Sequence, residues 1–445
     1  MSTAHRYTAK TAIAVVVANM VGTGVFTSIG FQIVDIKSTF VLLMLWLVGG
    51  IAAMCGALTY AELATRMPRS GGEYNFLSRI YHPAIGFVSG WVSLTVGFAA
   101  PTALAAMTFA AYFDAAMGDS FHINRMLAAV FLVGTITFVH GRSHAASGRL
   151  QNWFTIIKVL LIGLFVLAIF AVTDTPQVVH LLPVSGDGVL LASGAFAVSL
   201  IYVNYAYTGW NAATYITGEI ENPERSVPLV LIGGTAIVMA LYLALNATFL
   251  YAVPMAELEG RIEVGVIVAE HSFGSMGAML MGGLLSLLLI STVSAMLMAG
   301  PRVLQVMGED FRLFRLLART RDGVPRIAIY TQGALAIAFI VSATFDSVLV
   351  FSGFILGLSS LATVMGVFVL RWREGKNGTP EQSSGYRTWA YPIPPLLYGV
   401  IMLWTLCFIA VNRPMEAGVA AAIIVLGFAS YWLTERLSVD RAAAP

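Results

Sequence analysis

Twelve predominantly apolar stretches divide this chain, and each is about long enough to cross a membrane as a helix of roughly 20 residues. They lie at about 11–33, 39–65, 84–113, 125–141, 150–173, 189–218, 227–253, 275–307, 327–344, 346–370, 393–411 and 415–434. Only 11% of the residues are charged, which is about half the charge content of a soluble domain. The polar stretches between the apolar runs are loop-sized, so we expect one all-α integral membrane domain over residues 1–445.

The basic residues lie mostly on one side of this predicted topology. If the first helix starts inside and the crossings alternate, twenty of the 25 Lys and Arg residues fall on the inner side. Lys37, Arg125, Arg261 and Arg413 fall outside, and Lys158 lies within a helix. This bias predicts a multi-pass protein of the plasma (inner) membrane with both termini in the cytoplasm. The net charge of +2 then reflects topology, and we expect no nucleic-acid partner.

Two of the predicted helices are interrupted near their middles by the same small pattern. The first contains Asn19-Met20-Val21-Gly22-Thr23-Gly24, and the sixth contains Asn204-Tyr205-Ala206-Tyr207-Thr208-Gly209. A broken helix leaves backbone N–H and C=O groups unpaired, and hydrocarbon cannot satisfy them, so the breaks should line a polar cavity. The two helices run in opposite directions in the predicted topology, as an inverted repeat requires. The alternative is that the glycines only allow close helix packing.

We therefore expect five helices at about 11–173, an inverted repeat of five more at about 189–370, and helices 11 and 12 at about 393–434. The loop Pro-Arg-Ser-Gly-Gly-Glu-Tyr at 68–74 precedes a short amphipathic stretch through Tyr81, which we expect to lie along the inner surface. Pro228 suits the first turn of helix 7. Cys55 and Cys407 lie inside predicted helices, and we expect both to be free, buried thiols.

These motifs resemble those of the amino acid, polyamine and organocation superfamily, and within it the L-type amino acid transporter branch, which includes bacterial amino acid permeases. The resemblance rests on GTGVF at 22–26, AEL at 61–63 with PRSGGEY at 68–74, YAYTGWN at 205–211 with ENPER at 221–225, and GPR at 300–302. It implies the fold of the sodium-coupled leucine transporter, with helices 1 and 6 broken, and an amino acid as substrate. Animal relatives bond to a heavy chain through a cysteine in a loop that corresponds to 114–124. This chain has none there, so we expect no disulfide-linked heavy chain.

The chemistry of the breaks suits a zwitterion. The half-helix that begins after Gly24 presents free N–H groups and its positive dipole end to a carboxylate, with the Thr23 hydroxyl beside them. Carbonyl groups at the ends of the preceding half-helices can accept hydrogen bonds from an ammonium group. The resemblance implies that Tyr205 closes over the substrate as an aromatic lid, whereas a core aromatic residue is the alternative. The predicted substrate-binding residues are Met20, Gly22, Thr23, Gly24, Tyr205, Ala206, Tyr207, Thr208, Gly209 and Asn211.

Lys158 lies deep within the fifth predicted helix, where an ammonium group needs a partner inside the protein. The resemblance implies that it occupies the space of a sodium ion and tethers helix 5 to the first break and to helix 8. Its candidate partners are the Gly22 carbonyl and the hydroxyls of Ser291, Thr292 and Ser294. A fixed ammonium there argues against sodium coupling. A second possible role is release of its proton during the cycle, which would couple transport to pH.

The sequence therefore predicts a secondary active transporter of neutral L-amino acids, which works by alternating access without sodium. Exchange and proton coupling stay open, as does the preferred side chain. A transporter of cationic amino acids or amines is the alternative, and neutral substrates are favoured because neither broken helix contains an acid near its break. An integral membrane enzyme or a channel fits less well. The seven histidines are scattered without ligand spacing, so we expect no catalytic residue, metal or cofactor.

Overall fold

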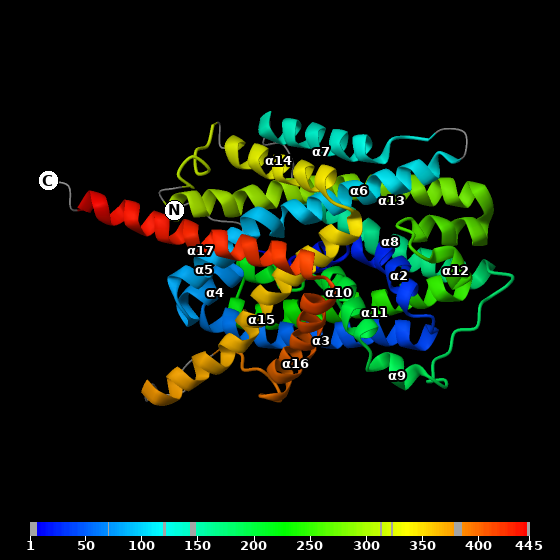
Figure 1. Cartoon of the computed structure of the whole chain (residues 1–445), viewed down its shortest axis with the longest axis horizontal. Helices are drawn as coiled ribbons and strands as arrows, with labels where there is room; N and C mark the ends of the chain where they lie inside the picture. The colour runs from blue at the N-terminus through cyan, green and yellow to red at the C-terminus, as the bar shows by residue number, and fades with distance from the viewer. Residues whose placement is uncertain are drawn as a thin grey trace.

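The computed structural model describes residues 7–69, 71–118, 122–142, 148–311, 314–321, 324–377 and 385–442. This part of the chain is an all-α bundle, with two isolated β-bridges and no strand (Figure 1). Its helices are α1 (Ala9–Met20), α2 (Gly24–Asp35), α3 (Thr39–Arg66), α4 (Gly72–Ile80), α5 (Pro83–Val92), the π-helix η1 (Ser93–Gly97), α6 (Ala99–Ala116), α7 (Arg125–Arg142), α8 (Gly148–Val172), α9 (Asp187–Leu191), α10 (Gly194–Tyr207), the 3-10 helix η3 (Ala212–Glu219), α11 (Pro223–Ala252), α12 (Met255–Leu258), α13 (Val264–Asp310), α14 (Arg326–Ser342), α15 (Phe345–Asn377), α16 (Ile393–Asn412) and α17 (Pro414–Ala442).

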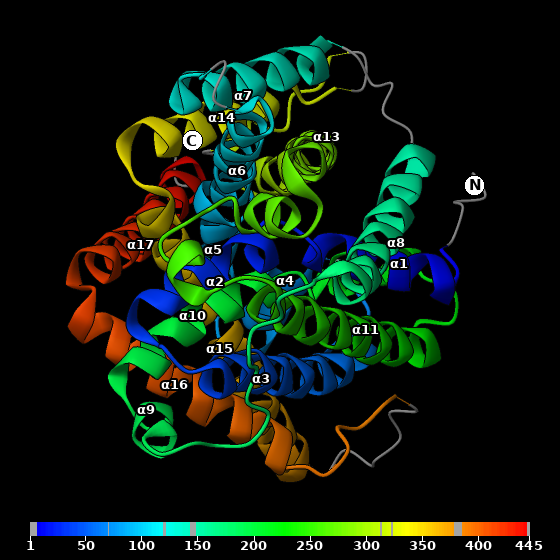
Figure 2. The same ribbon diagram turned by 90° about the vertical axis from the view of Figure 1, so that its right-hand side faces the viewer.

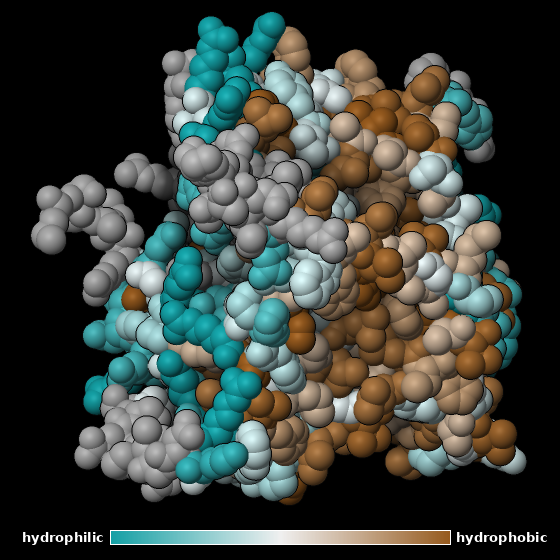
Figure 3. All heavy atoms as spheres, turned by 60° about the vertical axis from the view of Figure 1, so that its left-hand side comes forward, coloured by the Kyte–Doolittle hydropathy of each residue, from teal (hydrophilic) through white to brown (hydrophobic). Residues whose placement is uncertain are grey.

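Eight helical segments in the described part of the chain are long and apolar enough to cross a membrane. They are Ala9–Asp35, Thr39–Arg66, Pro83–Ala116, Pro223–Ala252, Val264–Asp310, Phe345–Lys376, Ile393–Asn412 and Pro414–Glu435. The other four predicted ranges contain the shorter or less apolar helices α7, α8, α10 with η3, and α14. The face of the molecule seen in Figure 3 is largely apolar beside a polar margin. The apolar surface includes side chains such as Phe131, Leu164 and Leu167, as expected for a multi-pass membrane protein.

The helices that carry the predicted breaks lie at the centre of the bundle. Most long helices run along the horizontal direction of Figure 1, with α4 and the C-terminal ends of α15 and α17 at the left and α9 and α12 at the right. The view along that direction in Figure 2 places α2 and α10 centrally and α7, α14, α16 and α17 at the periphery. The largest cluster of buried residues therefore surrounds the two broken helices and includes Val25, Trp46, Leu200 and Tyr242.

Short polar side chains and small residues determine how these helices begin and pack. The hydroxyls of Ser38 and Ser193 accept hydrogen bonds from backbone N–H groups in the first turns of α3 and α10, which stabilises both helix starts. Gly49 and Gly353 let α3 and α15 approach α10 closely. A Cβ atom on Gly49 would lie 2.3 Å from Val203, and one on Gly353 would lie 2.8 Å from Ile201. Such close packing of small residues is typical of membrane helices.

Two local expectations are wrong in detail. α11 begins at Pro223, which takes the first-turn position expected for Pro228, since the chain turns at Asn222 with a φ of 47°. Cys55 and Cys407 are free, but Cys407 is exposed because α16 lies at the periphery. The expected amphipathic stretch forms the short helix α4, in which six of nine residues are buried because it packs against α5, α15 and η3.

Candidate functional site

Both predicted breaks are present. α1 ends at Met20 and α2 begins at Gly24, and between them Val21 has a non-helical ψ of 81°. α10 ends at Tyr207, and the chain then passes through Thr208, with ψ 136°, and Gly209, with φ 106°, before η3 begins. The positive φ at Gly209 is a conformation that glycine adopts without steric cost.

The two breaks pack directly against each other through these glycines. A Cβ atom on Gly24 would lie 2.6 Å from the Cα atom of Ala206, and one on Gly209 would lie 2.8 Å from the carbonyl carbon of Asn19. Close packing and helix interruption are therefore properties of the same residues. Because glycine has no side chain, the unpaired backbone groups of the two breaks lie close together.

Tyr242 of α11 connects the two breaks by a contact that the sequence did not predict. Its hydroxyl lies 2.5 Å from the carbonyl oxygen of Met20 and 3.0 Å from that of Ala206. These carbonyls end the half-helices α1 and α10 and belong to the groups expected to receive a substrate ammonium. Because a hydroxyl has one proton, Tyr242 can donate fully to only one of them at a time.

The N-terminus of α2 presents the chemistry of an anion site. Thr23 is the N-cap residue, and its side chain makes no capping hydrogen bond. The first N–H groups of a helix have no partner within it, and the helix dipole adds positive potential at this end. A carboxylate at this place would meet several N–H donors and the Thr23 hydroxyl.

A cavity of about 590 Å³ runs past both breaks, a volume typical of small-molecule sites. Its wall contains all ten predicted substrate-binding residues, Met20, Gly22, Thr23, Gly24, Tyr205, Ala206, Tyr207, Thr208, Gly209 and Asn211. It continues along η1 and the second half of α13 to α4 and η3, which lead to the left end of the bundle in Figure 1. There the exposed residues Glu219 and Arg302 belong to its wall.

The bundle is tightly packed on the opposite side of the breaks. The ring of Phe31 stacks against those of Tyr202 and Phe345, with centroid distances of 5.8 and 5.6 Å. The loop after α12 closes on α2, where Gly260 N–H donates to the Gly30 carbonyl at 2.8 Å. The cavity therefore leads from the breaks toward one end of the bundle, while aromatic and backbone contacts close the path toward the other.

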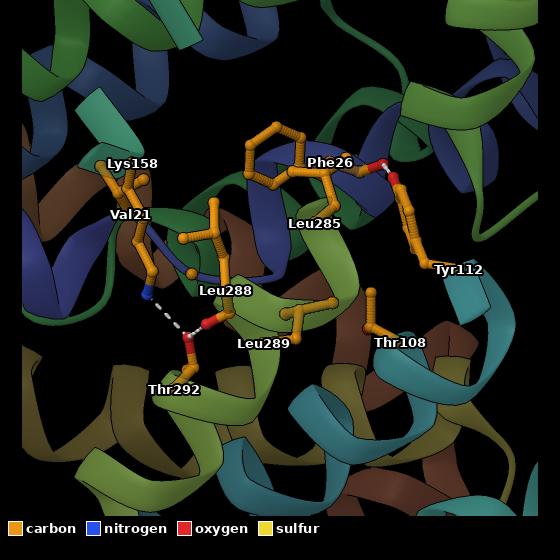
Figure 4. A pocket seen from close by; sticks show the side chains of 10 residues that line it. Val21, Phe26, Thr108, Tyr112, Lys158, Leu285, Leu288, Leu289 and Thr292 are labelled. Atoms are coloured by element: carbon orange, nitrogen blue, oxygen red, sulfur yellow. Dashed lines mark hydrogen bonds between the residues drawn. The ribbon is translucent and has the colours of Figure 1, made fainter. Parts of the chain in front are cut away.

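Lys158 projects from α8 toward α13, beside the first break (Figure 4). Its Nζ atom donates to the Thr292 hydroxyl at 2.7 Å, and that hydroxyl donates to the Leu288 carbonyl at 3.1 Å. Lys158, Thr292 and Gly22 line a second, small cavity of about 20 Å³. Among the other candidate partners, Ser291 is buried, and the Ser294 hydroxyl lies 2.9 Å from the His140 ring instead.

Glu73 on α4 is a cavity residue that the sequence analysis did not select. Its Oε1 atom accepts hydrogen bonds from the Tyr60 hydroxyl at 2.6 Å and from Asn211 Nδ2 at 3.1 Å, and its Oε2 atom accepts one from Ser359 at 2.8 Å. Asn211, predicted to bind substrate, thus has a protein partner. The motif Gly71-Gly72-Glu73 was visible in the sequence. The inward direction of its carboxylate depends on the positive φ values of both glycines, 124° and 51°.

Burial raises the pKa of the Glu73 carboxyl above its usual value. The hydrogen bonds from Tyr60, Ser359 and Asn211 act in the opposite direction, because they stabilise the carboxylate. Desolvation is the larger effect.

Comparison with known proteins agrees with this geometry. Residues 8–429 match a family described as "Amino acid permease". The chain is 26% identical over 431 residues to the large neutral amino acids transporter small subunit 2 of Mus musculus, a match that covers 95% of this chain and 79% of the relative. It is 26% identical to the serine/threonine exchanger SteT of Bacillus subtilis (strain 168), covering 95% and 94%. It is 25% identical to the b(0,+)-type amino acid transporter 1 of Homo sapiens, covering 81% and 74%.

Proposed function

Because this chain belongs to the amino acid permease family, we propose that it is a sodium-independent secondary transporter of neutral L-amino acids. The family and the relatives named above are transporters, which confirms the expectation that the chain is not an enzyme. The observation that carries the proposal is the meeting of two helix breaks on the wall of one cavity, at the N-terminus of α2.

The breaks supply partners for both charged ends of an amino acid. The carboxylate binds the N–H groups of the first turn of α2 and the Thr23 hydroxyl. The ammonium binds backbone carbonyls of the breaks, in competition with Tyr242 for those of Met20 and Ala206. Tyr205, which is buried beside the cavity, closes over the substrate side chain as a lid.

The transport cycle requires an inverted repeat of five plus five helices, followed by two more. In this proposal α7, α8, α10 with η3, and α14 also cross the membrane, which gives twelve crossings. The end of the bundle that contains α4 is then cytoplasmic, because Arg79, Arg371, Arg373 and Lys376 lie at the ends of α4 and α15. With both chain termini on that side, the cavity faces inward, and the aromatic stack of Phe31 closes the outer path.

Neutral substrates fit the charges of the cavity better than cationic ones. Glu73 is a buried acidic residue on the wall, but both its oxygen atoms already accept hydrogen bonds from neutral donors. A substrate cation is not needed to satisfy it. The names of two relatives, a large neutral amino acids transporter and a serine/threonine exchanger, support the same choice. The 114–124 segment without cysteine favours a transporter with no disulfide-linked heavy chain.

The Lys158 ammonium supports sodium independence. It links α8 to Thr292 of α13 beside Gly22 of the first break, and a fixed positive charge there disfavours a second cation. Transport is then driven by exchange of amino acids or by protons.

Uptake into proteoliposomes tests the proposal. We expect labelled serine or leucine to enter faster when the lumen contains an unlabelled neutral amino acid, at equal rates in sodium and choline buffers. Arginine should compete weakly. Absence of uptake under every gradient would contradict amino acid transport, a requirement for sodium would contradict the role of Lys158, and preferred uptake of arginine would contradict the substrate class.

A further inference from the structure

Glu73 is a buried carboxylate that links three helical elements to its own. Glu73 is 6% exposed. Its carboxylate accepts hydrogen bonds from Tyr60 on α3, from Ser359 on α15 and from Asn211 directly before η3. α4 itself contributes the carboxylate from its first turn. The same side chain lines the large cavity, so water and protons can reach it.

No basic side chain in the described ranges forms an ion pair with this carboxylate. The titratable groups that face it are neutral phenols: Tyr60 on α3, Tyr215 on η3 and Tyr398 on α16. Ser359 is the polar residue on the α15 side. The other charged residues on the cavity wall are Glu219 and Arg302, and both are exposed. A buried carboxylate without a positive partner is stabilised by taking up a proton.

We propose that Glu73 is a proton-binding site of this transporter, and that its protonation loosens the link between α4 and the broken helix at Asn211. The inference rests on the proposed transport function, because it assigns a coupling role to the wall of the same cavity.

The structure contains an acceptor for the carboxylic proton. When a hydronium ion in the cavity protonates the carboxylate at Oε2, it leaves neutral water, and the new O–H group donates a hydrogen bond to the Ser359 hydroxyl, which donates to Glu73 in the anionic state. Ser359 Oγ lies 3.2 Å from Ser89 Oγ, and either of these atoms can be the donor. Ser359 can therefore redirect its own proton to Ser89, so that each hydroxyl keeps a partner and no charged by-product forms.

Protonation at Oε2 weakens the hydrogen bonds at Oε1, although their donor and acceptor atoms stay in place. Tyr60 and Asn211 would then donate to the carbonyl oxygen of a neutral acid, and such bonds are about half as strong as those to a carboxylate. Asn211 directly precedes η3 and follows the second break. Weakening its bond frees the second half of the broken helix to move relative to α4, which is the movement that closes or opens the inward cavity.

The direction of the pH dependence follows from burial. Because desolvation raises the pKa of Glu73, the carboxyl takes up its proton at a higher pH than an exposed carboxyl does. The anion and the tight Asn211 link prevail at high pH, and the neutral acid and the loosened link prevail as the pH falls.

Infrared difference spectra of the purified full-length protein test proton binding without a transport assay. We expect a carboxylic C=O band that grows between about pH 8 and pH 4 in the wild type, with a midpoint above that of exposed carboxyls. This band should be absent in Glu73→Gln, shifted in Glu73→Asp and retained in Glu219→Gln, which changes an exposed carboxylate on the same cavity wall. A wild-type difference spectrum identical to that of Glu73→Gln would overturn the proposal.

Exchange assays in proteoliposomes, at equal pH on both sides, test the coupling role. The wild type and Glu219→Gln should show the same pH profile, whereas Glu73→Gln should show a flat one, and Glu73→Asp should restore a profile with a shifted midpoint. A Glu73→Gln profile that parallels the wild type would overturn the coupling. A titrating Glu73 band in a protein that exchanges no amino acid would leave the proton site standing and refute the transport function. Amino acid exchange by a protein without that band would support the transport function and refute the proton site.

Discussion

The hydroxyl of Tyr242 lies 2.5 Å from the carbonyl oxygen of Met20, the last residue of α1. The same hydroxyl lies 3.0 Å from the carbonyl oxygen of Ala206 in α10. One side chain on α11 thus holds the ends of both half-helices and competes for the backbone acceptors that a substrate ammonium would use. Substrate binding therefore has to rearrange this bond.

Replacement of Tyr242 by Phe should weaken the contact between the two half-helices. The change leaves two carbonyl groups without this donor, at a cost of about 1–3 kcal/mol for a buried unpaired group. We expect a lower melting temperature without substrate and a larger stabilising shift on addition of a bound amino acid, because the ammonium replaces the missing donor. Thermal-shift measurements check both values. Tyr251→Phe, on the same helix, should behave like the wild type, and equal amino acid shifts in all three proteins would refute the competition.

Replacement of Gly24 by Ala should separate the two breaks. The added Cβ atom would lie 2.6 Å from the Ala206 Cα atom, and overpacking of this kind costs about 1–3 kcal/mol. We expect exchange to fall about tenfold, corresponding to about 1.4 kcal/mol. Gly163→Ala on α8, where no neighbouring atom lies within 4 Å, is the matched control. Equal exchange rates in the two variants would show that contact between the breaks is not needed.

Loss of the Thr292 hydroxyl should lower thermal stability more than loss of the Lys158 ammonium group does. Thr292→Val removes the acceptor of the 2.7 Å bond and leaves a buried ammonium unpaired, whereas Lys158→Met removes the charge as well. Breaking a buried charged pair costs more than replacing it by apolar groups. We therefore expect Thr292→Val to unfold at a lower temperature than Lys158→Met, and the double variant to resemble Lys158→Met.

Ser286→Ala is the control for the hydroxyl change, because the Ser286 hydroxyl donates within α13, to the Gly282 carbonyl at 2.6 Å. Both Lys158→Met and Thr292→Val should slow exchange. Thermal stability in the opposite order, with Lys158→Met below Thr292→Val, would rule out the tether described here.

A buried ion cluster fixes the C-terminal half of α3 to α15. Glu62 is fully buried and accepts hydrogen bonds from Arg371 at 2.9 and 2.7 Å and from Thr388 N–H at 2.8 Å, with Arg66 at 2.9 Å. Arg371→Met should cost about 2–3 kcal/mol, less than the roughly 3–5 kcal/mol for a charge left entirely alone, because Arg66 stays. Adding Glu62→Gln should recover part of this loss. A double variant less stable than Arg371→Met would contradict the pairing.

The sequence predicted the breaks because membrane physics leaves few alternatives for Gly22-Thr23-Gly24 and Thr208-Gly209 in apolar helices. Local composition was enough to place the breaks, and the cavity wall includes every substrate-binding residue that we predicted from them. Helix positions followed from apolar runs for the same reason. Even α13, which starts at Val264, has its kink at Gly274, directly before the predicted start at 275.

Residues that reach the site from elsewhere could not be placed in this way. Tyr242 is 222 residues from Met20, and Glu73 is 138 residues from Asn211. Such contacts depend on how α11 and α4 pack against the broken helices. The apolar pattern of the sequence predicts helices, but it does not predict this packing. A tyrosine in an apolar helix and a glutamate in a polar loop each have many ordinary positions.

The most direct measurement is a structure of the protein with a bound neutral amino acid, such as leucine or serine. The account predicts density between the two breaks, with the carboxylate about 2.7–3.2 Å from N–H groups in the first turn of α2 and the ammonium toward the carbonyls near Met20 and Ala206. An amino acid bound away from the breaks, or a continuous helix through residues 20–24, would contradict it.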